Sequence, residues 1–66
     1  MTNERLIRLD EVERLTGLRR AHIYGLARKN KFPRPLKIGA RASAWQFSLV
    51  SQWVADRIRN AQGGAA

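Results

Sequence analysis

The sequence predicts one small α+β domain with three helices and a two-stranded β-hairpin between the second and third helices. Apolar residues recur at helical spacing near residues 9–16, 20–29 and 48–60. Pro33 and Pro35 interrupt that spacing, and the residues after them alternate between apolar and polar, as in short strands. A chain of 66 residues without cysteine has a thin core and no disulfide, so we expect one domain over residues 1–60.

The first helix is expected from Leu9 to Thr16, after a frayed terminus at residues 1–5. Leu9, Val12 and Leu15 lie on one helical face, and acidic residues occupy the first turns, where the helix dipole favours negative charge. Gly17 is typical of the left-handed residue that ends a helix. Because its start is acidic, we do not expect this end of the helix to lie against phosphates.

The second helix is expected from Arg20 to about Lys29. Ile23, Leu26 and Ala27 would face the core, and Asn30 is suited to a left-handed stop. The link between the first two helices is short and contains a glycine, which is typical of a helix-turn-helix.

A hairpin should follow, packed on the helices. Phe32 is expected in the core, Ile38 is expected to point inward, and Gly39 is expected to give the turn its backbone freedom. The tip would be residues 39–41, and residues 42–46 would return as a strand anchored by Trp45.

The last helix is expected to begin at Ser48 as N-cap and to run to about Asn60. Its apolar face would contain Leu49, Val50, Trp53, Val54 and Ile58. Trp53 is expected to be a central core residue. Residues 61–66 have nothing to bury and are expected to form a disordered tail.

The positive charge is concentrated in the middle of the chain. The net charge is +8, and residues 18–41 hold eight of the 13 Lys and Arg residues and no Asp or Glu. So many like charges indicate a polyanionic partner, and a basic helix followed by a basic hairpin suits a duplex.

Several other functions are disfavoured. Four of the five acidic residues lie in the first 13 positions and none neighbours His22 in a catalytic pattern, so we expect no enzyme and no cofactor. One His and no Cys make a metal site improbable. No apolar run approaches the ~20 residues of a membrane span, and the N-terminus is too charged for a signal peptide. We therefore expect a cytoplasmic protein associated with the nucleoid.

Residues 20–29 are the segment expected to enter the major groove. Arg20 is the first choice for reading a guanine, although a phosphate contact is the alternative. His22 can contact a base or a phosphate, or stay uninvolved, and Tyr24 is expected to contact a phosphate or to pack. The remaining cations, expected to contact phosphates, are Arg28, Lys29, Lys31 and Lys37. Trp45 and Trp53 could stack on bases, but their spacing favours core packing.

The motifs RLDEVERLTGL and IYGLARKNKFPRPLKIGARASAW, followed by a helix with Trp53, resemble the AlpA family of phage and prophage regulators. That family is similar to the excisionases and to the DNA-binding half of MerR-type regulators, and the resemblance covers about residues 5–59. It implies a winged helix-turn-helix that binds DNA and either controls an integrase gene or promotes prophage excision.

Three positions gain meaning from the resemblance. Arg19 stands where the family usually has a capping Ser; it cannot cap, at a cost of about 1 kcal/mol, but can reach a phosphate. Gly25 replaces a long polar residue and costs roughly 1 kcal/mol within a helix. Arg41, at the tip of the wing, is expected to reach the minor groove beside the helix.

The leading hypothesis is therefore a sequence-specific double-stranded DNA-binding protein of a phage or integrative element. It would regulate integrase or excision genes or act as an excisionase. The alternatives are an RNA-binding module, and a protein-interaction module that contacts integrase through the last helix. We expect a monomer in solution, whose copies can touch on tandem sites. The target sequence, and the choice between activator, repressor and excisionase, stay open.

Overall fold

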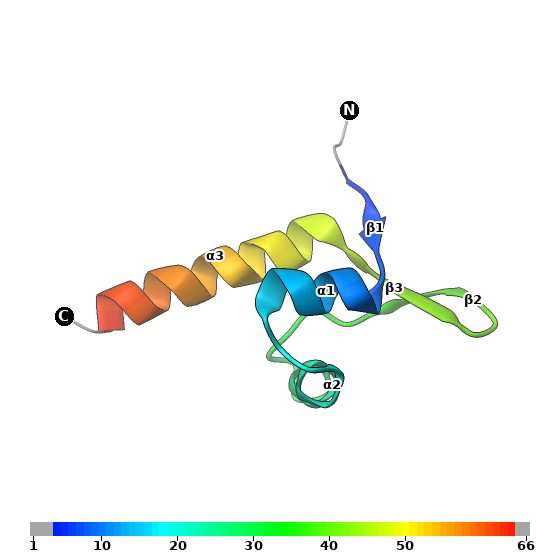
Figure 1. Ribbon diagram of the computed structural model, residues 1–66, viewed down its shortest axis with the longest axis horizontal. Helices are drawn as coiled ribbons and strands as arrows, with labels where there is room; N and C mark the ends of the chain where they lie inside the picture. The colour runs from blue at the N-terminus through cyan, green and yellow to red at the C-terminus, as the bar shows by residue number, and fades with distance from the viewer. Residues whose placement is uncertain (1–3, 65–66) are drawn as a thin grey trace.

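The computed structural model describes residues 4–64 and has the predicted α+β architecture of three helices with a hairpin (Figure 1). In chain order, its elements are β1 (Leu6–Ile7), α1 (Leu9–Thr16), α2 (Arg20–Arg28), β2 (Leu36–Gly39), β3 (Ala42–Gln46) and α3 (Phe47–Gly64). The β2–β3 hairpin and α3 extend from opposite ends of the body, and α2 crosses below α1 (Figure 1). This arrangement is consistent with a winged helix-turn-helix.

A third strand, β1, pairs with the hairpin; the sequence analysis did not predict this strand. The sheet is antiparallel in the order β1-β3-β2, and Ile7 of β1 pairs with Trp45. Next to this pair, the Phe47 amide donates to the Arg5 carbonyl at 2.8 Å. Residues 4 and 5 are therefore bound into the fold, which corrects the prediction of a frayed start over residues 1–5; residues 1–3 lie outside the described part.

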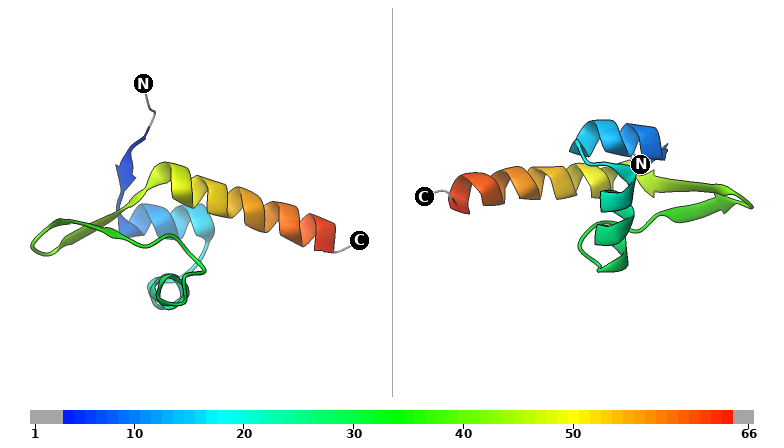
Figure 2. Two further views of the ribbon diagram at one scale, coloured as in Figure 1. Left: turned by 180° about the vertical axis from the view of Figure 1, so that it is seen from behind. Right: turned by 60° about the horizontal axis from the view of Figure 1, so that its bottom comes forward.

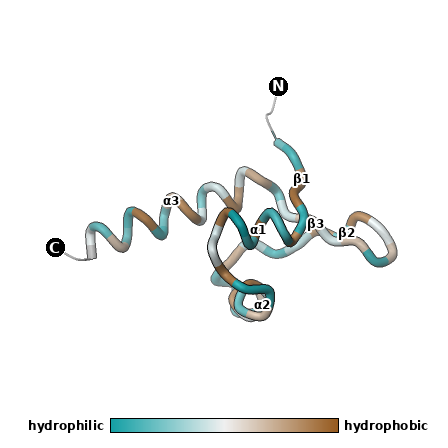
Figure 3. Tube along the Cα trace, viewed as in Figure 1, coloured by the Kyte–Doolittle hydropathy of each residue, from teal (hydrophilic) through white to brown (hydrophobic). Residues whose placement is uncertain are grey.

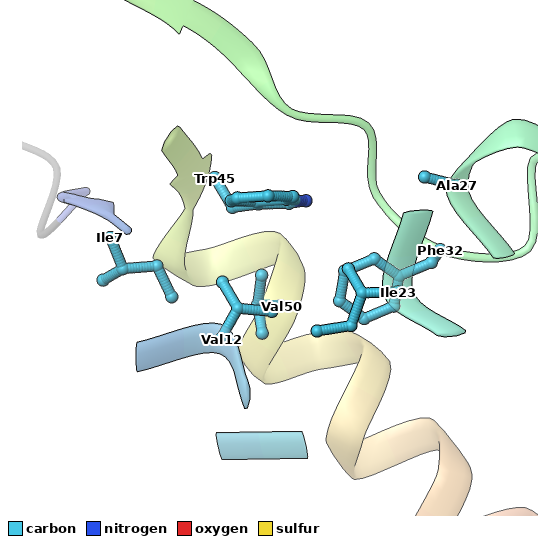
Figure 4. Packing of buried hydrophobic residues seen from close by; sticks show 7 residues of the cluster. All are labelled: Ile7, Val12, Ile23, Ala27, Phe32, Trp45 and Val50. Carbon is cyan, nitrogen blue, oxygen red and sulfur yellow. The ribbon is translucent and has the colours of Figure 1, made fainter. Parts of the chain in front are cut away.

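The core is assembled from every element except β2. Its buried side chains converge between the helices and the sheet in Figure 4 and are Ile7, Val12, Ile23, Ala27, Phe32, Trp45 and Val50. Trp45 is fully buried, and its indole N–H donates to the Pro33 carbonyl at 3.0 Å. The expected core roles of Phe32 and Trp45 are confirmed.

The hairpin projects from the body, so the prediction that Ile38 points into the core is wrong. Leu36 and Ile38 are 45% and 46% exposed, and the pairing of β2 with β3 is irregular between Lys37 and Gly39. Figure 3 shows that the hairpin carries a hydrophobic stretch away from the helices. The alternation was correct for a strand, but no helix covers this part of it. Among the described residues only Gly17 and Asn30 have a positive φ, so Gly39 does not supply the turn with a left-handed conformation.

The start of α3 is capped by Glu4, which lies near the N-terminus of the chain. The helix begins at Phe47, and Ser48 donates its backbone N–H (3.3 Å) and its hydroxyl to the Glu4 carboxylate. A carboxylate at a helix N-terminus satisfies free amides and suits the helix dipole. The prediction that Ser48 is the N-cap is therefore wrong, because Ser48 lies inside the helix and Glu4 accepts its amide.

The end of α3 lies beyond the predicted Asn60. The helix continues to Gly64, so residues 61–64 of the predicted tail are helical, and residues 65–66 lie outside the described part. Extending an existing helix adds one backbone hydrogen bond per residue, and Ala61 and Gln62 are good helix formers. The second half of α3 projects from the body (Figure 1), and Ile58 is 54% exposed. The prediction that Ile58 packs inward is wrong for that reason.

Candidate nucleic-acid interface

The turn between α1 and α2 holds the second helix in place through side-chain and backbone hydrogen bonds. Thr16 donates its hydroxyl to the Val12 carbonyl at 2.8 Å and accepts the Leu18 amide at 3.1 Å. Gly17 has φ 76° and donates to the Glu13 carbonyl at 2.7 Å. The predicted left-handed stop is confirmed, and this closed turn fixes how α2 leaves α1.

The buried face of α2 is the predicted one. Ile23 and Ala27 are buried and Leu26 packs partly against the same core. Asn30 adopts φ 60°, as predicted for the residue that ends this helix. The remaining faces of α2 are left available to a partner.

All nine residues proposed from the sequence to bind DNA have exposed side chains in the structure: Arg19, Arg20, His22, Tyr24, Arg28, Lys29, Lys31, Lys37 and Arg41. Arg19 is the N-cap of α2 and makes no side-chain capping hydrogen bond, as expected. The nine residues do not form one tight cluster. Seven of them lie along α2 or next to its ends and two lie on the hairpin, and these two elements project in different directions from the body (Figure 2).

The cations of residues 18–41 are not neutralised within the described part of the chain. The three ion pairs of residues 4–64 are Arg5–Glu11, Arg14–Asp10 and Arg59–Asp56. Each of them uses an arginine from outside the basic segment. The eight cations of that segment therefore meet no carboxylate among the described residues, and their charge is available to an external anion.

The aromatic residues near the interface mostly serve packing. Tyr24 is 37% exposed, and its ring lies against Trp45 with the centroids 5.8 Å apart and the planes tilted by 55°. This contact places Tyr24 beside the strand that leads out of the hairpin. Trp53 is half-buried, contacts the Phe32 ring edge-on at 4.8 Å, and donates its indole N–H to the Lys31 carbonyl at 2.7 Å. Its predicted central place in the core is corrected to a position at the core's edge.

Two arginines that are not among the nine predicted DNA-binding residues line hollows next to α2. Arg34 lines a hollow of about 330 Å³ with Tyr24 and Arg28. Arg8 lines another of about 420 Å³ with Tyr24 and Arg41. Arg34 lies within the basic segment, so the charge pattern contained a signal for it. Arg8 lies among acidic residues and was hidden, because the charges of residues 1–17 nearly cancel.

The described residues carry no sign of two other kinds of site. Within residues 4–64, no group of three or more His, Asp or Glu side chains could hold a metal ion. In the same span, no helix combines the length and the apolar character that crossing a membrane requires.

Comparison with known proteins identifies the family of the chain. Residues 5–58 match the family described as "Prophage CP4-57 regulatory protein (AlpA)". The chain is 42% identical over 64 residues to "Uncharacterized protein ORF88" of Enterobacteria phage P4, a match that covers 97% of this chain and 73% of that protein. No solved structure matches the chain. With more than half of its length matched, the chain belongs to the AlpA family of prophage regulatory proteins.

Proposed function

We propose that the chain is a sequence-specific double-stranded DNA-binding protein that regulates the integrase or excision genes of a phage or integrative element, or acts as an excisionase. The observation that carries this proposal is the exposed basic segment on α2 and the hairpin, which meets no carboxylate in the described structure. Membership of a prophage regulatory family supports it. The protein would act in the cytoplasm, at the nucleoid.

In this proposal, α2 enters the major groove and the hairpin follows the adjacent backbone. Arg20, in the first turn of α2, would read a guanine, since an arginine can donate two hydrogen bonds to O6 and N7. His22 follows two positions later on the same helix, on another side of it, and can contact a base or a phosphate. The C-terminal end of α2 contacts phosphates through Arg28, Lys29 and Lys31, while Lys37 on the hairpin contacts another.

The test of this proposal is the salt dependence of binding to duplex DNA. Four to six phosphate contacts predict that log affinity falls with log salt at a slope of about −4 to −5. Fluorescence anisotropy with a labelled duplex between low and moderate salt measures the slope, and RNA of matched length is the control. A slope shallower than about −2, or equal competition by RNA, contradicts the proposed footprint.

Footprinting on the attachment site and on the integrase promoter of the parent element separates the two finer roles. Protection at the promoter alone favours a transcriptional regulator, and protection beside the attachment site favours an excisionase. The same complexes, analysed by sedimentation, test whether a monomer in solution assembles on tandem sites. A pull-down with integrase after nuclease treatment tests whether the two proteins also contact each other directly.

A further inference from the structure

A hollow of about 420 Å³ lies where α1, α2 and the hairpin meet. Its lining residues are Arg8, Leu9, Asp10, Tyr24, Arg41, Ser43 and Trp45. Trp45 is fully buried, and Tyr24 packs against it. The hollow therefore has a rigid aromatic side and lies between the two elements proposed to contact DNA.

Two arginines approach this hollow from different elements. Arg8 is the N-cap residue of α1, and Arg41 lies in the two-residue turn between β2 and β3. Both side chains are exposed, and among residues 4–64 neither forms an ion pair. Ser43 and Tyr24 add hydroxyl-bearing side chains to the lining. Two guanidinium groups with neighbouring hydroxyls are the donor set that binds a phosphate group.

Asp10, the acidic residue that lines the hollow, is already paired with an arginine. Asp10 would repel a phosphate, but its carboxylate accepts a hydrogen bond from Arg14 at 3.2 Å and forms an ion pair with it. The next acidic residue, Glu11, is paired with Arg5 at 3.7 Å. Both carboxylates at the start of α1 therefore have an arginine beside them, which lowers their repulsion of a phosphate at Arg8.

We propose that this hollow binds one backbone phosphate of the DNA, held between Arg8 and Arg41. The inference rests on the proposed function and adds to it a contact from α1. The bound phosphate would belong to the strand that passes between the groove occupied by α2 and the groove beside the hairpin. Arg8 would then fix the angle between these two contacts on the duplex.

The first test compares two variants that each remove one positive charge. Arg8→Ala is expected to weaken duplex binding about tenfold, the loss typical of a hydrogen bond to a charged group. It should also make the salt slope shallower by about 0.9. Arg59→Ala, on the far half of α3, is the matched control and should change affinity less than twofold. Equal effects of the two variants would overturn the inference.

Neither variant is expected to disturb the fold, which a thermal melt can verify. Arg8 makes no side-chain capping hydrogen bond, and Arg59 pairs only with exposed Asp56 on its own helix. Arg8→Lys is a second variant that keeps the charge. It should keep the slope of the parent chain and lose part of the affinity, because lysine cannot bind a phosphate through two parallel hydrogen bonds.

The second test locates the phosphate. Duplexes with a single neutral methylphosphonate at successive positions should show one position where the parent chain loses about tenfold or more and Arg8→Ala loses clearly less, because only Arg41 remains to contact that phosphate. If the losses add at every position, Arg8 holds no particular phosphate and the inference is wrong. If the parent chain shows no salt-dependent duplex binding, the proposed function itself fails. If the parent chain binds duplex DNA and Arg8→Ala does not change the affinity, only the proposed phosphate site is wrong.

Discussion

Replacing Trp53 tests how the loop after α2 is tied to α3. The indole N–H donates to the Lys31 carbonyl at 2.7 Å, and the ring meets Phe32 edge-on at 4.8 Å. Phe32 is buried in the core and follows the end of α2 in the chain. Trp53→Ala therefore removes two contacts between α3 and the segment that follows α2.

The expected cost is lower than for a fully buried tryptophan. A complete loss in a core costs about 3–5 kcal/mol, but Trp53 is only half-buried. The hydrogen bond contributes about 1 kcal/mol and the aromatic pair about 0.5–1.5 kcal/mol, to which the partial burial of the ring adds. We expect Trp53→Ala to destabilise the domain by about 2–3 kcal/mol, which lowers its melting temperature by about 10–20 °C in a domain of this size.

Thermal melting followed by circular dichroism measures this effect. Trp53→Phe is the matched variant, because it keeps an aromatic ring beside Phe32 and loses the hydrogen bond to Lys31; it should melt about 4–8 °C below the parent chain. A Trp53→Ala variant that melts like the parent would refute the reasoning. If that variant also lost DNA binding, Trp53 would be a contact residue, and the assigned packing of α3 would be wrong.

Three further substitutions test the interface, and a fourth tests the stability of α2. Arg20→Ala should reduce the binding free energy by about 1–3 kcal/mol on a cognate duplex and by less on random DNA, whereas Lys29→Ala should weaken binding to the two duplexes similarly. If Arg20→Ala also weakens binding to the two duplexes equally, Arg20 contacts a phosphate and not a base. If Arg41 holds the phosphate together with Arg8, Arg41→Ala should weaken binding equally on paired sites with an A·T-rich and a G·C-rich flank; a larger loss on the A·T-rich flank would place Arg41 in the narrow minor groove, as the family resemblance implies, and would contradict the shared phosphate. Gly25→Ala should stabilise the domain by about 1 kcal/mol, since a Cβ there meets nothing within 4 Å, and a lower melting temperature would contradict this.

The sequence predicted best the features that depend on neighbouring residues. Gly17 and Asn30 end their helices in left-handed conformations, and both were expected from the apolar spacing that stops beside them. The buried face of α2 was also predictable, because Ile23 and Ala27 recur at helical spacing. These signals are local, so tertiary packing did not change them.

Features that depend on distant residues were missed or misplaced. Glu4 caps α3 across 44 positions of the chain, and no local pattern links it to Ser48. Ile38 follows a correct strand alternation, yet the hairpin projects beyond the helices that would have covered it. The candidate interface shows the same limit, since charge counting along the chain found the basic segment and overlooked Arg8, which only the fold brings to the hollow that Arg41 also lines.

Trp45 links α2 to β1 and to the segment before the hairpin. Trp45 pairs through its backbone with Ile7 of β1, donates its indole N–H to Pro33 before the hairpin, and packs its ring against Tyr24 on α2. Because it is fully buried, its position is determined by the core and varies little. A thin core can therefore hold two protruding elements at a defined angle, and a duplex that contacts both must match that angle. If the chain binds DNA as proposed, Trp45 would contribute to recognition through geometry, because its side chain is buried in the core.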